Sequence, residues 1–118
     1  MIFLSDRDRY IDLKEGLARV RDNKKLFGRM LGMFISSGEL VALEESFAQS
    51  NQAKAGEVVH AIKGAAGNLS LKEIFNLSVM MMDEIRHGKM SRESLDEMKF
   101  AYEETNKHIK EVIAELAS

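Results

Sequence analysis

One histidine in this chain stands among residues that suit phosphoryl transfer. His60 is followed one helical turn later by Lys63 and Gly64, and two turns later by Gly67. A neutral imidazole nitrogen is a nucleophile, and an ammonium group one turn away can approach the oxygens of a phosphoryl group. An exposed charge pair of this kind is worth only about 0.2–1 kcal/mol, so Lys63 is expected to tune the transfer rather than create it. The pattern therefore predicts that His60 accepts a phosphoryl group with the assistance of Lys63.

The glycines near His60 lie in a segment whose apolar spacing predicts a helix, although each glycine inside a helix costs roughly 1 kcal/mol relative to alanine. A helical wheel centred on Ile62 places the apolar residues on one face and His60 on the opposite face. The residues that share the face of His60 are Ala53, Gly56, Gly64 and Gly67. Small side chains on a solvent-facing surface leave room for another molecule to approach closely. We therefore expect Gly56, Gly64 and Gly67 to form a docking surface around His60.

Composition favours a single helical domain over residues 1–118. Hydrophobic residues make up 45% of the chain and charged residues 31%, which is typical of a soluble globular protein. Proline is absent, and the abundance of Leu, Met, Ala, Glu and Lys favours helix. The chain has no cysteine, which excludes a disulfide framework and fits a reducing cytoplasm. The net charge is −2 without a basic cluster, so nucleic acid is not expected as a partner.

The sequence does not predict membrane insertion. The longest apolar run, Met30–Ile35, is far shorter than the roughly 20 residues of a membrane span. The apolar start Met1–Leu4 is followed at once by charged residues, unlike a signal peptide. We therefore expect a cytoplasmic protein. The sequence leaves the choice between monomer and dimer open, and a monomer is expected because nothing beyond the glycines on the face of His60 suggests a dimer interface. Met1 is compatible with a free-standing protein, but a fragment of a larger sensor kinase would look the same.

Apolar spacing predicts a short N-terminal helix and a longer helical segment after it. The short helix is expected from about Asp12 to Val20. A clean i, i+3, i+4 stripe then runs over residues 24–35 and resumes over residues 40–48. The intervening Ser36-Ser37-Gly38 is a weak point, so the pattern leaves open whether this segment is one kinked helix or two. The residues that can cap a first short helix are Ser5 and Asp6.

Three further helices are predicted in the second half of the chain. The histidine helix is expected from about Gln52 to Asn68. Ser70–Glu73 reads as a capping box for a helix that ends at His87–Lys89, and Ser91 or Ser94 can cap the last helix. Short connections favour antiparallel neighbours. The predicted fold is therefore all-α, an up-down-up-down four-helix bundle with a short additional N-terminal helix.

The segment around His60 resembles the signature of a known family. The pattern His60-x-x-Lys63-Gly64-x-Ala66-x-Asn68-Leu69 is similar to that of histidine-containing phosphotransfer (HPt) domains of bacterial multistep phosphorelays. Upstream, Asp12-Leu13-x-x-Gly16-Leu17-x-Arg19-Val20 and Leu26-Phe27-x-x-Met30-Leu31-x-x-Phe34 resemble the opening of that family. The resemblance covers roughly residues 10–88. Ser70 stands where members often have glycine.

The resemblance implies a place in a two-component phosphorelay. His60 would accept a phosphoryl group from an aspartyl phosphate on a response-regulator receiver domain and donate it to the aspartate of another, which makes the chain a phosphoprotein. Lys63 would help to neutralise the phosphate, and Gly64 and Gly67 would clear space for the receiver. A hybrid sensor histidine kinase is an implied partner, and Mg²⁺ is expected on the receiver, with no cofactor in this chain. Because the sequence has no nucleotide-binding glycine loop, self-phosphorylation from ATP is not expected.

Two other interpretations remain. Glu57-x-x-His60 and Glu84-x-x-His87 could be the two Glu-x-x-His pairs of a di-metal carboxylate bundle. On helical wheels, however, these histidines point away from the bundle interior, which disfavours a metal site. A non-catalytic helical adaptor with a degenerate site is the second alternative, and the intact pair of His60 and Lys63 counts against it.

Overall fold

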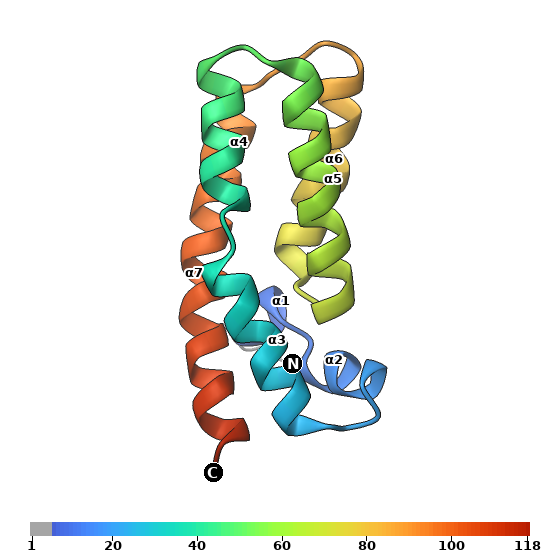
Figure 1. Cartoon of the computed structure of the whole chain (residues 1–118), viewed down its shortest axis with the longest axis vertical. Coiled ribbons are helices and arrows are strands. Elements are labelled where there is room, and N and C mark those ends of the chain that lie inside the picture. The colour runs from blue at the N-terminus through green and yellow to red at the C-terminus, as the bar shows by residue number, and fades with distance from the viewer. Residues whose placement is uncertain (1–5) are drawn as a thin grey trace, which may run out of the picture.

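The computed structural model describes residues 6–118, and all regular structure in that range is helical (Figure 1). The helices are α1 (Asp6–Tyr10), α2 (Leu13–Arg19), α3 (Lys24–Ser36), α4 (Glu39–Ala48), α5 (Gln52–Leu69), α6 (Lys72–Arg86) and α7 (Arg92–Leu116). The cap predicted at Ser5 lies outside the described residues, and α1 begins at Asp6.

The longer helices form the predicted four-helix bundle. α3 and α4 follow one another as the first arm, and α5, α6 and α7 are the other three (Figure 1). α5 packs against α4 on one side and α6 on the other, whereas α7 packs on α3 and α6. The short helix α1 contacts α6 and α7, and α2 contacts α3 and α5. The all-α up-down-up-down architecture is confirmed, with two short helices in front of it.

The first arm consists of two helices, which answers the question that its sequence left open. α3 ends at Ser36 and α4 begins at Glu39. The hydroxyl of Ser36 donates to the backbone oxygen of Gly32 at 3.1 Å, and a serine that bonds to the preceding turn competes with the helical backbone. Ser37 is extended, with ψ 151°, and Gly38 provides no side-chain cap for α4. The chain therefore changes direction at these two residues.

This arm is also the part of the described chain that is long and apolar enough, by length and composition, to cross a membrane. The stretch Lys24–Ala48 has a window with a mean hydropathy of 1.3. One such stretch is weak evidence for a span, because helices of soluble proteins pass the same test. Here the stretch is broken between α3 and α4, and Phe27, Leu31 and Leu43 are fully buried in the bundle.

The core is assembled from the apolar faces that the sequence predicts. α5 buries Ala55, Val58, Val59, Ile62, Ala66 and Leu69. Across the bundle, the ring of Phe34 stacks on that of Tyr102, with 5.3 Å between the ring centroids. Burial raises the pKa of the Tyr102 phenol, and the nearby charge of Glu39 adds to the effect. Because its apolar face is buried in this core, α5 is fixed on one side, and its opposite side faces solvent.

Of the N-terminal caps predicted for α6 and α7, the first is wrong and the second is confirmed. The capping box predicted over Ser70–Glu73 is wrong, because the N-cap of α6 is Leu71, which makes no side-chain cap bond. Ser70 instead ends α5 in the left-handed conformation, with φ 57°, where glycine is the usual residue. At α7, of the two predicted caps, Ser91 is the one used, since its hydroxyl accepts from the backbone N–H of Ser94 at 3.2 Å.

Candidate functional site

α5 presents His60 on the side opposite its buried face. His60 is exposed, whereas Val59 and Ile62 are fully buried. Lys63 lies one turn further along and is half-buried. Within residues 6–118, neither His60 nor Lys63 makes a hydrogen bond or an ion pair through its side chain. An imidazole open to solvent beside an unpaired ammonium suits an anionic reactant that arrives from outside.

The three glycines predicted to share this face have different surroundings. Gly64 is exposed, and a β-carbon added to it would meet nothing within 4 Å. Gly67 is half-buried, and a β-carbon there would lie 3.4 Å from Cε2 of Phe75 on α6. Gly56 is also half-buried, with Cγ2 of Ile85 at 3.8 Å from such a β-carbon. Only Gly64 stands fully clear, because α6 packs along α5 and its side chains reach the edges of the face.

Residues from three helices surround His60 in a shallow groove of about 350 Å³. This groove, called the His60 groove below, is lined by Arg19, His60, Lys63, Gly64, Gly67, Asn68 and Phe75. Arg19 comes from α2 and Phe75 from α6. The sequence pattern placed neither residue in the site, because the wheel of one helix carries no information about its neighbours. The one sequence signal that could have identified Arg19 as a groove residue is its position in the segment that resembles the opening of the family.

Gly16 allows α2 to approach closely enough to bring Arg19 to the groove. A β-carbon on Gly16 would lie 2.5 Å from Cζ of Phe27 and 3.2 Å from the backbone oxygen of Leu69. A larger residue would therefore push α2 away from α3 and α5. Arg19 follows one turn later on the same helix.

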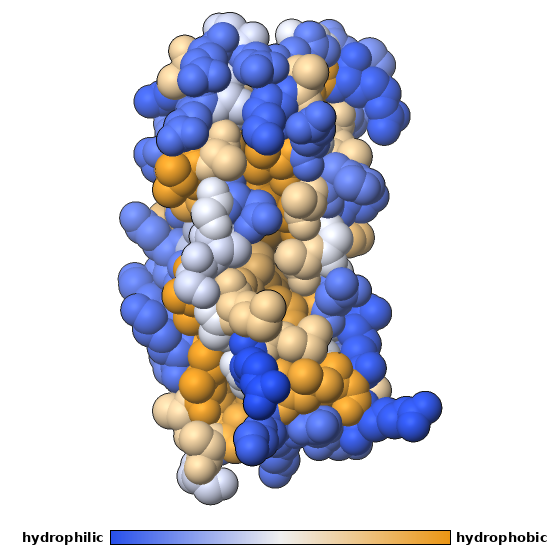
Figure 2. Space-filling model, in the orientation of Figure 1, coloured by the Kyte–Doolittle hydropathy of each residue, from blue (hydrophilic) through white to orange (hydrophobic). Residues whose placement is uncertain are grey.

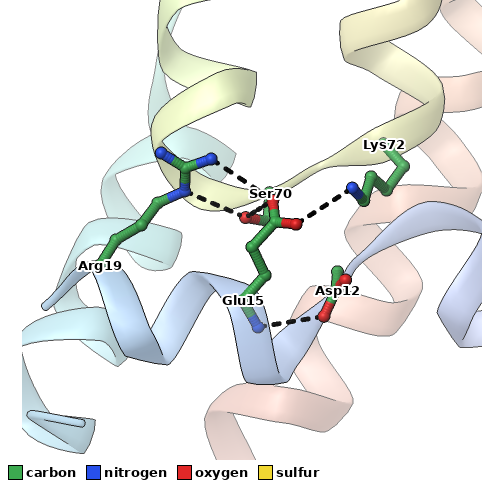
Figure 3. Close-up of polar contacts among 5 residues, drawn as sticks. All are labelled: Asp12, Glu15, Arg19, Ser70 and Lys72. Carbon is green, nitrogen blue, oxygen red and sulfur yellow. Dashed lines mark hydrogen bonds and ion pairs between the residues drawn. The ribbon is translucent and has the colours of Figure 1, made fainter. Parts of the chain in front are cut away.

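A set of polar contacts, the Ser70 network, ties α2 to the end of α5 (Figure 3). The hydroxyl of Ser70 donates to Oε1 of Glu15 at 2.8 Å, and Nζ of Lys72 donates to Oε2 at 3.3 Å. Arg19 makes two longer contacts of 3.4 Å, from Nη2 to Oε1 of Glu15 and from Nε to Oγ of Ser70. Asp12 accepts from the backbone N–H of Glu15 at 3.0 Å, and its own N–H donates to the backbone oxygen of Ser70 at 2.9 Å.

The network has an electrostatic consequence for Glu15. The hydrogen bond from Ser70 holds the pKa of Glu15 below its ordinary value of 4.5, and Lys72 and Arg19 lower that pKa further. Each donor favours the ionised carboxylate over the neutral acid. The network therefore contains a carboxylate that stays charged at neutral pH with Arg19 beside it.

The surface next to the groove, on the side of α4, is apolar. Figure 2 shows apolar and near-neutral residues running down the middle of the face on which α4 and α5 lie side by side, between hydrophilic flanks. Met33 is 65% exposed. A cavity of about 290 Å³ in this region is lined in part by Met33, Ala65 and Asn68. Exposed apolar surface of this kind is typical of a protein interaction site.

The two Glu-x-x-His pairs do not come together. Glu57 and His60 of the first pair are exposed on α5. In the second pair, Glu84 accepts from the hydroxyl of Ser94 at 2.7 Å, and the ring of exposed His87 bonds to a backbone oxygen of its own helix. In the described part of the chain, no group of three or more His, Cys, Asp and Glu residues is arranged to hold a metal ion. The geometry of both pairs thus disfavours the di-metal interpretation.

Comparison with known proteins gives two matches and one negative result. The family model of the Hpt domain matches residues 29–118, which include His60, Lys63 and Gly64. The fold is similar to the crystal structure of the HPT domain from a sensor hybrid histidine kinase from Shewanella, with a TM-score of 0.79 and 15% sequence identity. That similarity covers 92% of this chain and 97% of the other. No significantly similar relative is found among the curated proteins.

The family match spans most of the chain, and the fold agrees with it. Together they support a phosphotransfer role in the phosphorelays of two-component signalling, where the partners are of the receiver-domain and kinase classes. Such domains are typically soluble. The chain belongs to the family of Hpt domains.

Proposed function

We propose that this protein is a phosphorelay intermediate in which His60 carries the phosphoryl group. The observation that supports this most directly is the exposed, unpaired imidazole of His60 with Lys63 beside it and open space above Gly64. All three residues lie within the matched family span. The donor is an aspartyl phosphate on a receiver domain, and the acceptor is the aspartate of another receiver.

The transfer needs no other nucleophile from this chain. The lone pair of an imidazole nitrogen attacks phosphorus, the N–P bond forms, and the P–O bond to the receiver aspartate breaks. The electron pair leaves with the freed carboxylate, and the second ring nitrogen releases its proton to solvent. Attack by a second receiver aspartate reverses these steps. Lys63 lowers the cost of bringing the anionic phosphoryl group to the imidazole.

The remaining groups are contributed by the partners. We place the Mg²⁺ on the receiver domain and expect the relay to begin at a hybrid sensor histidine kinase in the cytoplasm. The chain acts as a carrier and does not use ATP. Exposed Gly64 is the point at which the receiver comes closest to α5, since a side chain there would stand in its way.

The test is label transfer from a receiver domain phosphorylated with ³²P. The wild-type protein should take up label in a form that is stable to base and labile to acid, as expected of phosphohistidine. His60→Gln should take up none, and the matched control His87→Gln, at another exposed histidine, should behave as wild type. Equal labelling of wild type and His60→Gln would overturn the proposal. Tight receiver binding without transfer would favour the adaptor interpretation.

A further inference from the structure

We infer that α2 is part of the receiver-docking surface and that Arg19 is its docking cation, exchanging its contacts with Glu15 and Ser70 for an anionic group on the receiver. This inference rests on the proposed function and extends it to a residue outside the matched span of residues 29–118. It concerns association with the partner, whereas His60 and Lys63 serve the chemical step.

The charge of the groove supports this role. Arg19 and Lys63 are the two charged residues among those that line the His60 groove, and both are cations. The whole chain, in contrast, has a net charge of −2. The lining of the groove therefore carries two cations and no carboxylate, with Glu15 beside Arg19 and exposed Glu57 one turn before His60 as the nearest opposite charges. Complementary charge speeds and orients association with an anionic partner surface.

The position of Arg19 separates docking from chemistry. Its guanidinium rests beside Ser70, which is ten residues after His60 along α5 and the turn that follows it. At 1.5 Å per residue, the helical part of this separation, from His60 to Leu69, spans about 13 Å along the axis of α5. That is too far to touch a phosphoryl group on the imidazole. A domain of about 100 residues has a radius of gyration of about 13 Å, so a receiver seated on His60 is large enough to reach Arg19 as well.

Arg19 can leave its present partners at little cost. Its two contacts are 3.4 Å long, whereas a strong charge-assisted N–H···O bond is about 2.7–2.9 Å. Without Arg19, Glu15 keeps the hydroxyl of Ser70 at 2.8 Å and the ammonium of Lys72 at 3.3 Å. The side chain of Arg19 is already 50% exposed. When Arg19 leaves, the carboxylate of Glu15 therefore keeps two hydrogen-bond donors. Because the arginine side chain is already half exposed, its departure uncovers little buried surface.

The helix that carries Arg19 is held firmly, which limits the entropy lost on docking. Gly16 packs α2 against Phe27, and the backbone N–H of Asp12 donates to Ser70 at 2.9 Å. Only the arginine side chain has to be reordered when the partner binds. A pre-organised helix with one adjustable side chain is an economical docking element.

The experiment measures initial rates of transfer from a ³²P-labelled receiver domain against the concentration of this protein. We expect Arg19→Ala to raise KM roughly five- to twentyfold while kcat stays within about twofold of wild type. Arg19→Lys should recover part of the loss, and the KM of Arg19→Ala should depend less on salt. The control Lys110→Ala removes an exposed cation on α7 and should leave KM within about twofold.

Glu15→Gln distinguishes a docking cation from a structural one. Gln keeps an oxygen for the Ser70 hydroxyl but removes the charge that holds Arg19, so the docking role predicts a KM lower than that of wild type. A structural role predicts a higher KM, as for Arg19→Ala, and would overturn the inference. A KM for Arg19→Ala no higher than that for Lys110→Ala would do the same.

Phosphoramidate, a small phosphodonor that does not need docking, separates this inference from the proposed function. It should label His60 at the same rate in wild type and Arg19→Ala. If Arg19→Ala is labelled more slowly, Arg19 acts on the chemistry and the docking role is wrong. If wild-type His60 accepts label neither from phosphoramidate nor from any receiver tested, the proposed function and this inference both fail.

Discussion

Ser70 donates its hydroxyl to Glu15 at 2.8 Å across 55 positions of sequence, and this bond joins the end of the histidine helix to the helix that carries Arg19. The residue does so from a left-handed backbone conformation, with φ 57°. At a left-handed position, where glycine is the usual residue, this serine has a specific partner for its hydroxyl. The contact suggests a direct test of what each part of Ser70 contributes.

Substitutions at Ser70 should separate its hydroxyl from its backbone conformation. Ser70→Ala loses the hydrogen bond to Glu15 and keeps a β-carbon in the left-handed region. Ser70→Gly loses the same bond but removes the conformational cost, which is about 1 kcal/mol. We therefore expect Ser70→Ala to be less stable than Ser70→Gly by about 1 kcal/mol in urea unfolding at equal m values. Equal stabilities would mean that the left-handed turn is not strained.

The charge of Glu15 should make stability depend on acid pH. Its folded-state pKa lies below 4.5, so its stabilising effect is complete above pH 4.5 and is lost as the pH falls through the folded value. The stability difference between wild type and Glu15→Gln should be full at pH 7 and should shrink as the pH falls below 4.5. Urea unfolding at several pH values measures it, with Glu45→Gln, an exposed carboxylate on α4, as the control. A constant difference across this range would contradict the network.

The two glycines that follow His60 at one and two turns should respond differently to a large side chain. Gly64→Leu should keep its helicity, since the added β-carbon meets nothing within 4 Å and helix propensity improves by roughly 0.5–1 kcal/mol. It should still slow transfer at least about tenfold, because leucine occupies the space that the receiver needs. At Gly67 the added β-carbon would only touch Phe75, at 3.4 Å, so the outer carbons of leucine decide the effect; we expect Gly67→Leu to crowd the ring with them and to lose about 1–3 kcal/mol of stability.

Circular dichroism and label transfer on both variants decide this. A Gly64→Leu protein that unfolds would mean that this glycine serves packing. A Gly64→Leu protein that transfers at the wild-type rate would place the docking surface elsewhere.

The sequence predicted most of α5 because the evidence for it is local. Apolar residues at helical spacing fix which side is buried, so the exposure of His60 opposite Ile62 followed directly. The break in the first arm was visible as a weak point, but whether the chain would bend there depended on how Ser36 and Gly38 were used.

The parts that could not be predicted involve residues distant in sequence. The motif at Ser70 looked like a helix cap, and nothing local showed that Glu15 would take its hydroxyl. Gly67 looked fully exposed on the wheel because the wheel does not include Phe75 of the next helix. The place of Arg19 in the groove was also missed, because it depends on the close packing of Gly16 against neighbouring helices, which the wheel of one helix does not include.

The close packing at Gly16 has a consequence for where this domain can be cut. The span that the family model matches, residues 29–118, keeps His60 and Lys63 but lacks α2 and the start of α3. That piece would lose Arg19 from the groove and would leave Ser70 without its partner on Glu15. A cut at Arg29 would also remove Ile11 and Phe27, which are fully buried, so the span recognised by the family model is smaller than the unit that holds the core and this face together.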